Sequence, residues 1–204
     1  RENERLRKTI KLQNAHESYV LQDAYIIGWS STDFTSVLTI NRGSDAGIAT
    51  NMCAVTETGE VVGLVTQVGK NYAEVKTVLD STLEISSTIS SSGYNGMVKG
   101  GYMNGTEKLL KMDYLPSAAI IRNNQQVVTS GSTVYPRGLI VGSVVDAGFE
   151  QTGVAKYALL KSAADIDSLE QVFIITQYTT DVDTAGASAD GSADTTAETT
   201  APTE

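Results

Sequence analysis

Two eleven-residue segments match each other, and this repeat constrains the fold more than any other feature of the sequence. They are Gly59–Gly69 and Gly138–Gly148, 79 positions apart, with five identical residues. Alternating valines in both are typical of a strand with one buried face. Gly63 and Gly142 stand in mid-strand, where glycine marks a bulge, a barrel corner or a close backbone approach. The repeat predicts two small barrels of related topology; the alternative is chance similarity between Gly/Val-rich hairpins.

The rest of the chain also reads as short strands. The runs expected to form strands are Ala24–Trp29, Ser36–Ile40, Met52–Thr56, Val61–Val68, Ala73–Val78, Leu83–Ile89, Met97–Lys99, Lys108–Tyr114, Gln126–Thr129, Leu139–Val145, Lys156–Leu160 and Val172–Thr176. Turn residues separate these runs, and no helical run between them is long enough to connect parallel strands. The pattern therefore predicts an all-β protein of antiparallel barrels or sandwiches and disfavours a parallel α/β fold.

Glycines and one proline mark the predicted turns and barrel corners. Glycine reaches backbone conformations that other residues avoid, and proline presets a turn. The residues that we assign to this structural role are Gly43, Gly47, Gly59, Gly63, Gly131, Pro136, Gly138 and Gly142.

Residues 1–19 are polar, contain no Gly or Pro and consist of good helix formers. The residues Asn3, Leu6, Ile10 and Gln13 follow a 3-4 spacing, and with Leu6 at a heptad d position, Asn3 and Ile10 occupy a positions. An Asn at an a position favours a parallel two-stranded coil. We expect this segment to be the end of a longer coiled coil, with these four residues in a dimer seam. The alternative is a short amphipathic helix docked on its own domain.

The negative charge is concentrated at the carboxyl end. The formal net charge is −9, but residues 179–204 contain six acidic residues and no Lys or Arg, which leaves 18 acidic and 15 basic residues in 1–178. The tail lacks large apolar side chains, so we expect it to be disordered, as a solvated spacer rather than an acidic interaction tail. The excess of acidic over basic residues argues against binding to the phosphate backbone of a nucleic acid. The chain begins at Arg1 rather than Met, which indicates a piece of a longer protein.

The sequence offers no recognisable reaction centre. The one histidine, His16, lies in the helical segment, and the one cysteine, Cys53, is expected to be a small buried side chain. One Cys excludes an internal disulfide and a multi-Cys zinc site. The nucleophile elbow, the phosphate-binding loop and the calcium loop are all absent. We therefore predict a protein that is not an enzyme and has no metal or cofactor.

Six motifs, in order, resemble the family of the bacterial rod shape-determining protein MreC. They are Ala24–Trp29, Leu38–Ile48, Val55–Val65, Val127–Gly131, Tyr135–Val144 and Ala164–Val172. The chain departs from the family in two places. Asn123–Gln126 stands where a Gly-Asp turn is expected, and Tyr135 stands where Phe is usual.

The resemblance implies two six-stranded barrels similar to those of chymotrypsin-like proteases, one inserted in the other. We expect residues 1–19 to form the helix, 20–35 plus 105–178 a discontinuous first barrel, 36–104 an inserted second barrel, and 179–204 the tail. The N-terminal strand would pair with the C-terminal half. The fold would then act only as a surface, without a catalytic triad.

The resemblance also implies a non-catalytic scaffold of the cell-wall elongation machinery that maintains cell shape. It would be anchored in the cell membrane by a single span missing from this chain, with this fragment on the extracytoplasmic side. The implied partners are a second copy of itself, the elongation-specific penicillin-binding transpeptidase, MreD and, across the membrane, the MreB cytoskeleton. Two alternatives remain. One is an unrecognised hydrolase; the other is a module that binds a cell-wall saccharide or peptide, for which Trp29, Tyr72, Tyr94 and Tyr102 are candidate aromatic contacts.

Overall fold

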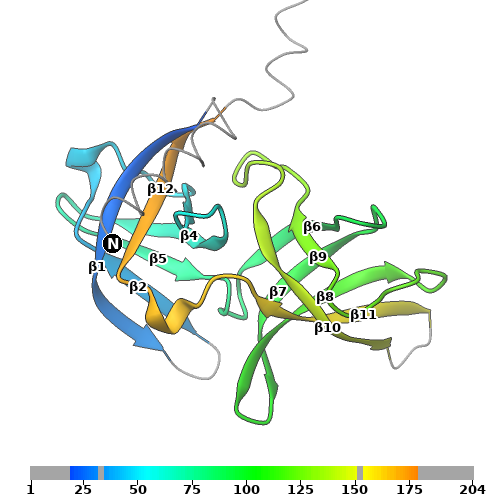
Figure 1. Ribbon diagram of the computed structural model, residues 1–204. Coiled ribbons are helices and arrows are strands. Elements are labelled where there is room, and N and C mark those ends of the chain that lie inside the picture. Colours follow the sequence, from blue (N-terminus) through cyan, green and yellow to red (C-terminus); the bar gives the residue numbers. More distant parts are fainter. Residues whose placement is uncertain (1–18, 32–34, 151–153, 179–204) are drawn as a thin grey trace, which may run out of the picture.

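The computed structural model of the protein describes residues 19–31, 35–150 and 154–178. The predicted coiled coil, with Asn3, Leu6, Ile10 and Gln13, and the acidic tail lie outside these residues. The described chain folds into two closed antiparallel barrels of six strands each, set side by side (Figure 1). The all-β, two-barrel prediction is therefore confirmed.

The first barrel uses the beginning and the end of the described chain. Its strands are β1 (Val20–Ser31), β2 (Ser36–Ile40), β3 (Cys53–Val55), β4 (Val61–Val68), β5 (Ala73–Thr77) and β12 (Gln171–Gln177). The second barrel holds the central strands. They are β6 (Glu84–Ile89), β7 (Asn95–Asn104), β8 (Glu107–Pro116), β9 (Gln126–Thr129), β10 (Ile140–Phe149) and β11 (Ala155–Ser162). Two short 3₁₀ turns, η1 (Ser44–Ala46) and η2 (Ile166–Ser168), lie in connections.

Both barrels follow the same path. Around the first ring the order is β3-β4-β5-β2-β1-β12, and around the second it is β9-β10-β11-β8-β7-β6. Five strands of each ring therefore correspond one to one in chain order. The sixth strand differs, because β12 follows the second barrel in sequence and β6 precedes the other strands of its own ring. The chain thus leaves the first barrel through β6 and returns to it through β12.

The division of the chain differs from the one that we expected. The discontinuous barrel consists of residues 20–77 and 171–177, and the inserted barrel of residues 84–162. The expected boundaries, 20–35 plus 105–178 and 36–104, are wrong because β2 pairs with both β1 and β5. This pairing keeps the first five strands together, and only β12 returns from the carboxyl end. Hydrophobic alternation predicts where a strand lies in the sequence, but it does not predict which other strand pairs with it.

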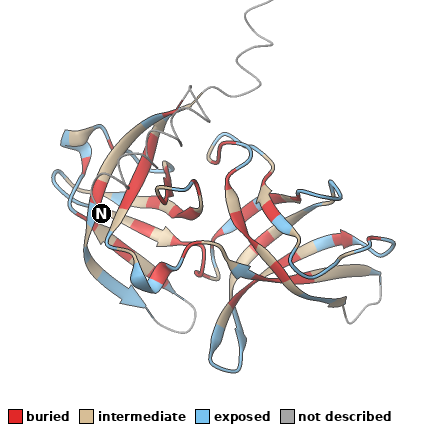
Figure 2. Cartoon of the chain, viewed as in Figure 1, coloured by how far each residue is buried: buried red, intermediate tan, exposed pale blue. Residues whose placement is uncertain are grey.

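A continuous apolar core fills both barrels, as the buried positions in Figure 2 show. In β2 every second residue is buried, so Leu38 and Ile40 point into the first barrel. Burying such a side chain contributes about 2–3 kcal/mol. Ile85 and Leu160 play the same part in the second barrel. The single core cluster explains why the two barrels lie against each other.

The mid-strand glycines of the repeat are sites of close backbone approach. A Cβ atom on Gly63 would overlap the main-chain oxygen of Lys76 in β5, and a Cβ on Gly142 would overlap that of Lys161 in β11. The register also shifts once in each of these pairs of strands, between Val65 and Gln67 in β4 and at the matching place in β10. The repeated segments therefore occupy equivalent strands and meet equivalent constraints.

Most of the assigned turn glycines have a left-handed backbone. The ones with positive φ are Gly47, Gly59, Gly131 and Gly138. Gly43 differs, because its φ is −144° and a Cβ there would overlap the oxygen of Gly69. The Pro136 carbonyl accepts a hydrogen bond from the Thr129 hydroxyl. Asn124 lies in Asn123–Gln126, the segment that departs from the family pattern. Its φ is 64°, a conformation that Asn tolerates better than most residues.

Candidate protein-binding surface

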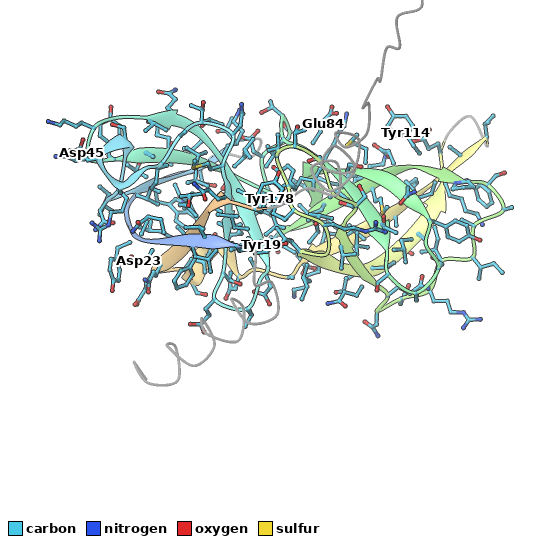
Figure 3. The ribbon with its side chains drawn as sticks, turned by 90° about the horizontal axis from the view of Figure 1, so that it is seen from above. Tyr19, Asp23, Asp45, Glu84, Tyr114 and Tyr178 are labelled. Carbon is cyan, nitrogen blue, oxygen red and sulfur yellow. The ribbon has the colours of Figure 1, made fainter. Side chains whose placement is uncertain are left out.

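The first part of the site is the junction between the barrels, where the β9–β10 connection packs on the first barrel. Tyr135 of this connection is only 5 % exposed and belongs to the shared core. The Tyr178 hydroxyl donates to the Ser132 carbonyl over 2.9 Å. The rings of Tyr19 and Tyr178 meet edge to face with centroids 6.4 Å apart, and Figure 3 shows them side by side. The ends of the described chain therefore lie at the junction.

The groups at this junction are held in their neutral forms. Burial raises the pKa of Tyr19 to about 12, with a smaller contribution from Cys53. Burial also raises the pKa of Tyr135 and of the Cys53 thiol above their ordinary values. Cys53 is 1 % exposed, so the expectation of a small buried side chain is confirmed. A protonated, enclosed thiol is a poor nucleophile.

The matched segments of the repeat touch each other across the junction. The Ile140 amide donates to the Gly59 carbonyl over 3.1 Å, and Glu60 and Ile140 form a parallel bridge. A threonine closes each turn in the same way. The hydroxyl of Thr56 accepts the Glu60 amide at 3.2 Å, and that of Thr129 accepts the Leu139 amide at 3.0 Å.

Sequence reasoning missed these threonines and the three junction tyrosines. Thr56 stands three residues before Gly59, whereas Thr129 stands nine residues before Gly138, so the repeat does not align them. Only the position of Thr129 directly before Ser130-Gly131 signals a turn. Nothing in the sequence indicates that Tyr135 packs on the other barrel.

An acidic cleft lies beside this junction. Its volume is about 440 Å³, and it is formed by β1, the β3–β4 turn and the connection that carries η2. Tyr25, Leu169 and Phe173 supply its apolar part. Its carboxylates come from Glu57, Glu60, Asp165 and Glu170, and none of the described lining residues is a Lys or Arg. Among the described residues, the carboxylates of Glu60, Asp165 and Glu170 contribute a negative potential that favours cationic groups.

The strand β1 borders the cleft and exposes apolar side chains. The exposed fraction is 44 % for Tyr25, 61 % for Ile27 and 40 % for Trp29. A β-bulge falls between Ile26 and Gly28 in the pairing with β2. Exposed aromatic and aliphatic residues beside a charged cleft are typical of protein-binding surfaces.

The aromatic residues proposed for saccharide binding come from separate elements. Trp29 lies in β1, Tyr72 in the β4–β5 turn and Tyr102 in β7 of the other barrel. These three are exposed, but Tyr94 is partly buried and packs against the core.

The described residues offer no recognisable reaction chemistry. They contain no group of three His, Cys, Asp or Glu side chains placed to hold a metal, and His16 lies outside them. No helix within the described ranges is long and apolar enough to span a membrane. The fold therefore defines a class: a protein built from two closed six-stranded β-barrels.

The chain belongs to the MreC family. The family model described as "Rod shape-determining protein MreC, barrel core" matches residues 26–176, which include both barrels. The cell shape-determining protein MreC of Listeria monocytogenes is 26 % identical over 194 residues, which cover 92 % of this chain and 65 % of the relative. The chain therefore spans just under two thirds of this relative's length.

Solved structures show the same fold. MreC from Listeria monocytogenes aligns with a TM-score of 0.72 at 23 % identity, over 85 % of this chain and 86 % of the other. A "major periplasmic domain from the cell shape-determining filament MreC" aligns at 0.66 and 22 %, over 78 % and 97 %. A "Complex between Penicillin-Binding Protein (PBP2) and MreC from Helicobacter pylori" contains a chain that aligns with a TM-score of 0.60 at 18 % identity, over 77 % of this chain and 98 % of the other.

Proposed function

We propose that this chain is the barrel portion of a non-catalytic scaffold that maintains cell shape by binding proteins of the cell-wall elongation machinery. The observation that carries this proposal is the family match across both barrels, residues 26–176. The exposed apolar residues of β1 and the acidic cleft beside them supply a surface of the kind that binds proteins. The described residues give no sign of a competing catalytic centre.

The partner that we propose first is the elongation-specific penicillin-binding transpeptidase. A structural neighbour of the same family is described in complex with a penicillin-binding protein, which supports this choice. We also propose that the barrels lie on the extracytoplasmic side of the cell membrane, attached by a span outside this chain. A neighbour described as a periplasmic domain supports that side. MreD in the membrane and MreB across it complete the proposed assembly.

Binding of the transpeptidase is the direct test. Its purified ectodomain is titrated onto immobilised chain, and we expect saturable binding that survives removal of residues 179–204. The matched control is the ectodomain of a division-specific penicillin-binding protein, which should bind at least about tenfold more weakly, a difference of about 1.4 kcal/mol. Equal binding of both ectodomains, or no binding of either, contradicts the proposed function.

Self-association through the N-terminal segment is a separate proposal. A parallel coil raises the local concentration of two barrel pairs, so weak contacts with a partner become effective. Replacing Leu6 and Ile10 together by Asp should shift the longer natural chain from dimer to monomer in analytical ultracentrifugation. Lys8→Asp is the control, because Lys8 falls at the outer f position of the same heptad. A dimer unchanged by the double substitution refutes the role of the coil.

A second candidate function is binding of a cell-wall saccharide or peptide. The acidic cleft favours it, because Tyr25 and Phe173 offer ring surfaces beside carboxylates that would attract an ammonium group. Trp29 is the only tryptophan in the chain, so its fluorescence reports on β1 alone. Soluble cell-wall fragments that change this emission in a saturable way, and lose the effect in Tyr25→Ala, would support this function over the scaffold.

A further inference from the structure

The strand β1 has a backbone edge that is paired over only half of its length. Its residues Val20–Tyr25 pair with β12, and the last backbone bond on this side runs from the Ile26 amide to the Glu170 carbonyl over 3.0 Å. Upstream of Gln171 the chain turns away into η2. Beyond Ile26, β1 continues to Ser31 beside β2, and in the described part of the chain no strand pairs with Ile27–Ser31 along the β12 side.

The equivalent edge of the second barrel is covered at the first two residues beyond its paired part. There β7 pairs with β6 as far as Lys99, and Gly100 and Gly101 follow. The Gly101 amide donates to the Leu79 carbonyl over 2.9 Å. A Cβ on Gly100 would overlap the backbone of Leu79, and a Cβ on Gly101 would contact Ser81 at 2.5 Å. The β5–β6 connection therefore lies on β7 at Gly100 and Gly101. Among the described residues, the connection before β12 bonds to the backbone of β1 only as far as the Ile26 amide.

The open edge also lacks the usual protection. Exposed edge strands carry charges or proline that prevent another strand from pairing. Residues 27–31 read Ile-Gly-Trp-Ser-Ser and contain neither. The Lys108 ammonium of β8 reaches the far end of the edge, where it donates to the Ser31 hydroxyl over 2.9 Å, so the part without a charge is Ile27–Ser30. Ile27 and Trp29 are 61 % and 40 % exposed, so they can cover a pairing strand with apolar contacts. The edge is thus suited to strand addition, in which backbone bonds give affinity and side-chain contacts give specificity.

Charge selects the occupant. The paired part of the edge ends at Glu170, where the acidic cleft with Glu57, Glu60 and Asp165 begins. A second copy paired antiparallel through its own residues 27–31 would bring no Lys or Arg of that strand to this cleft. A segment with Lys or Arg at this end would instead place its cations near the carboxylates of Glu60, Asp165 and Glu170 and beside the ring of Tyr25.

We propose that residues Ile27–Ser31 of β1 accept an extended segment of another protein as an added antiparallel strand, with basic residues at its carboxyl end held in the acidic cleft. The direction follows from β12, which runs antiparallel to β1. A strand that continues β12 upstream would end, at its carboxyl end, next to Gln171 and Glu170. The proposal deepens the scaffold function and rests on it, because it supplies the binding mode of a protein partner.

Two amidated octapeptides test the proposal: Ser-Thr-Val-Thr-Val-Thr-Lys-Lys and the same sequence ending in Glu-Glu. Each is titrated into the ¹⁵N-labelled chain, with amide shifts and Trp29 emission as readouts. We expect the lysine peptide to shift the amides of residues 27–31 and to bind at least about tenfold more tightly than the glutamate peptide. Equal affinities, or shifts confined to the second barrel, overturn the proposal. So does a concentration-dependent shift of these amides without peptide, since it would mean that a second copy occupies the edge.

Ile27→Lys places a charge on the edge and should weaken the lysine peptide about tenfold. Met103→Lys is the matched control, because Met103 is exposed in β7 at the equivalent hairpin, and it should leave binding unchanged. Both side chains are exposed, so thermal melts of the two variants should match the parent chain.

The transpeptidase ectodomain separates this proposal from the scaffold function. If it binds the parent chain and Ile27→Lys equally well, the edge proposal fails and the scaffold function stands. If it binds neither, the scaffold function fails, and the peptide titration still decides whether the edge accepts a strand.

Discussion

The two barrels share one strand order but differ in what covers it. In the second barrel the β5–β6 connection lies on β7 and covers its edge at Gly100 and Gly101. In the first barrel the connection before β12 contains η2, and among the described residues no strand pairs with the end of β1 on that side. The comparison teaches that two rings with the same strand order can differ in how far a short connection covers their edges, which is the difference on which the proposed strand addition rests.

The largest expected effect tests whether the two rings are equivalent. Gly63→Ala and Gly142→Ala should each destabilise the chain by more than about 3 kcal/mol, because the added methyl overlaps a main-chain oxygen that cannot move freely. Urea denaturation measures the free energy of unfolding. Gly138→Ala is the control: its Cβ would have open space, so only its positive φ should cost about 1 kcal/mol. A parent-like stability for only one of the mid-strand variants would break the equivalence.

The two turn threonines test where the rings differ. Thr129 is 1 % exposed, and its hydroxyl binds both the Leu139 amide and the Pro136 carbonyl. Thr129→Val should cost about 2–3 kcal/mol, because it leaves two buried backbone groups without a partner. Thr56→Val removes hydrogen bonds from a shorter and more exposed turn and should cost about 1 kcal/mol. Equal losses in urea titrations would show that the long β9–β10 connection does not depend on its threonine.

A smaller effect is expected at the contact between the barrels. The Tyr135 hydroxyl is buried and has no hydrogen-bond partner within the described residues. Tyr135→Phe removes an unsatisfied polar group without changing the packing, so the chain should gain about 0.5–1 kcal/mol. Tyr178→Phe, which loses the bond to the Ser132 carbonyl, should instead lose a similar amount. If thermal melting shows that Tyr135→Phe is destabilised, the hydroxyl has a partner that the structure does not show.

The smallest effect concerns the surface ion pairs of the second barrel. Lys99 and Glu84 lie 2.8 Å apart on paired strands, and both side chains are accessible to water. Because water and salt screen such pairs, Glu84→Gln should leave the melting temperature within about 1 °C of the parent. Glu107→Gln, whose partner is Lys161 at 3.3 Å, should behave alike. A salt-sensitive drop of several degrees would show that charges help to close this ring.

Much of the fold could be predicted before the structure was known. All twelve expected strands are present, because alternation of Val and Ile with polar residues, broken by turn residues, is a local signal. The repeat correctly indicated two related barrels. The boundaries between them were wrong, because the partner of β2 depends on ring closure and not on the residues of β2 itself. The resemblance to MreC was carried by the order of motifs, and the family match confirms it.

The candidate site was predicted less well. Asn3, Leu6, Ile10 and Gln13 remain predictions, since they lie outside the described residues. The acidic cleft joins carboxylates that are more than 100 positions apart, such as Glu57 and Glu170. Spacing along a chain says nothing about such a meeting, because turns and connections set it.

The sequence by itself determined the local structure of this protein: which segments form strands, which glycines allow close approach, and which repeated segments form equivalent strands. It did not determine where each strand ends, since Met97–Lys99 was expected where Asn95–Asn104 is observed. Those properties depend on backbone sterics and on alternation within a few residues. Only the tertiary structure decided how each ring is closed: β12, from the carboxyl end of the chain, closes the first ring, and β6 closes the second ring before its other strands follow in sequence. It also decided that Tyr135 packs between the barrels. Such contacts depend on which surfaces can be buried together once the strands exist, and many pairings of similar apolar strands satisfy the same local pattern.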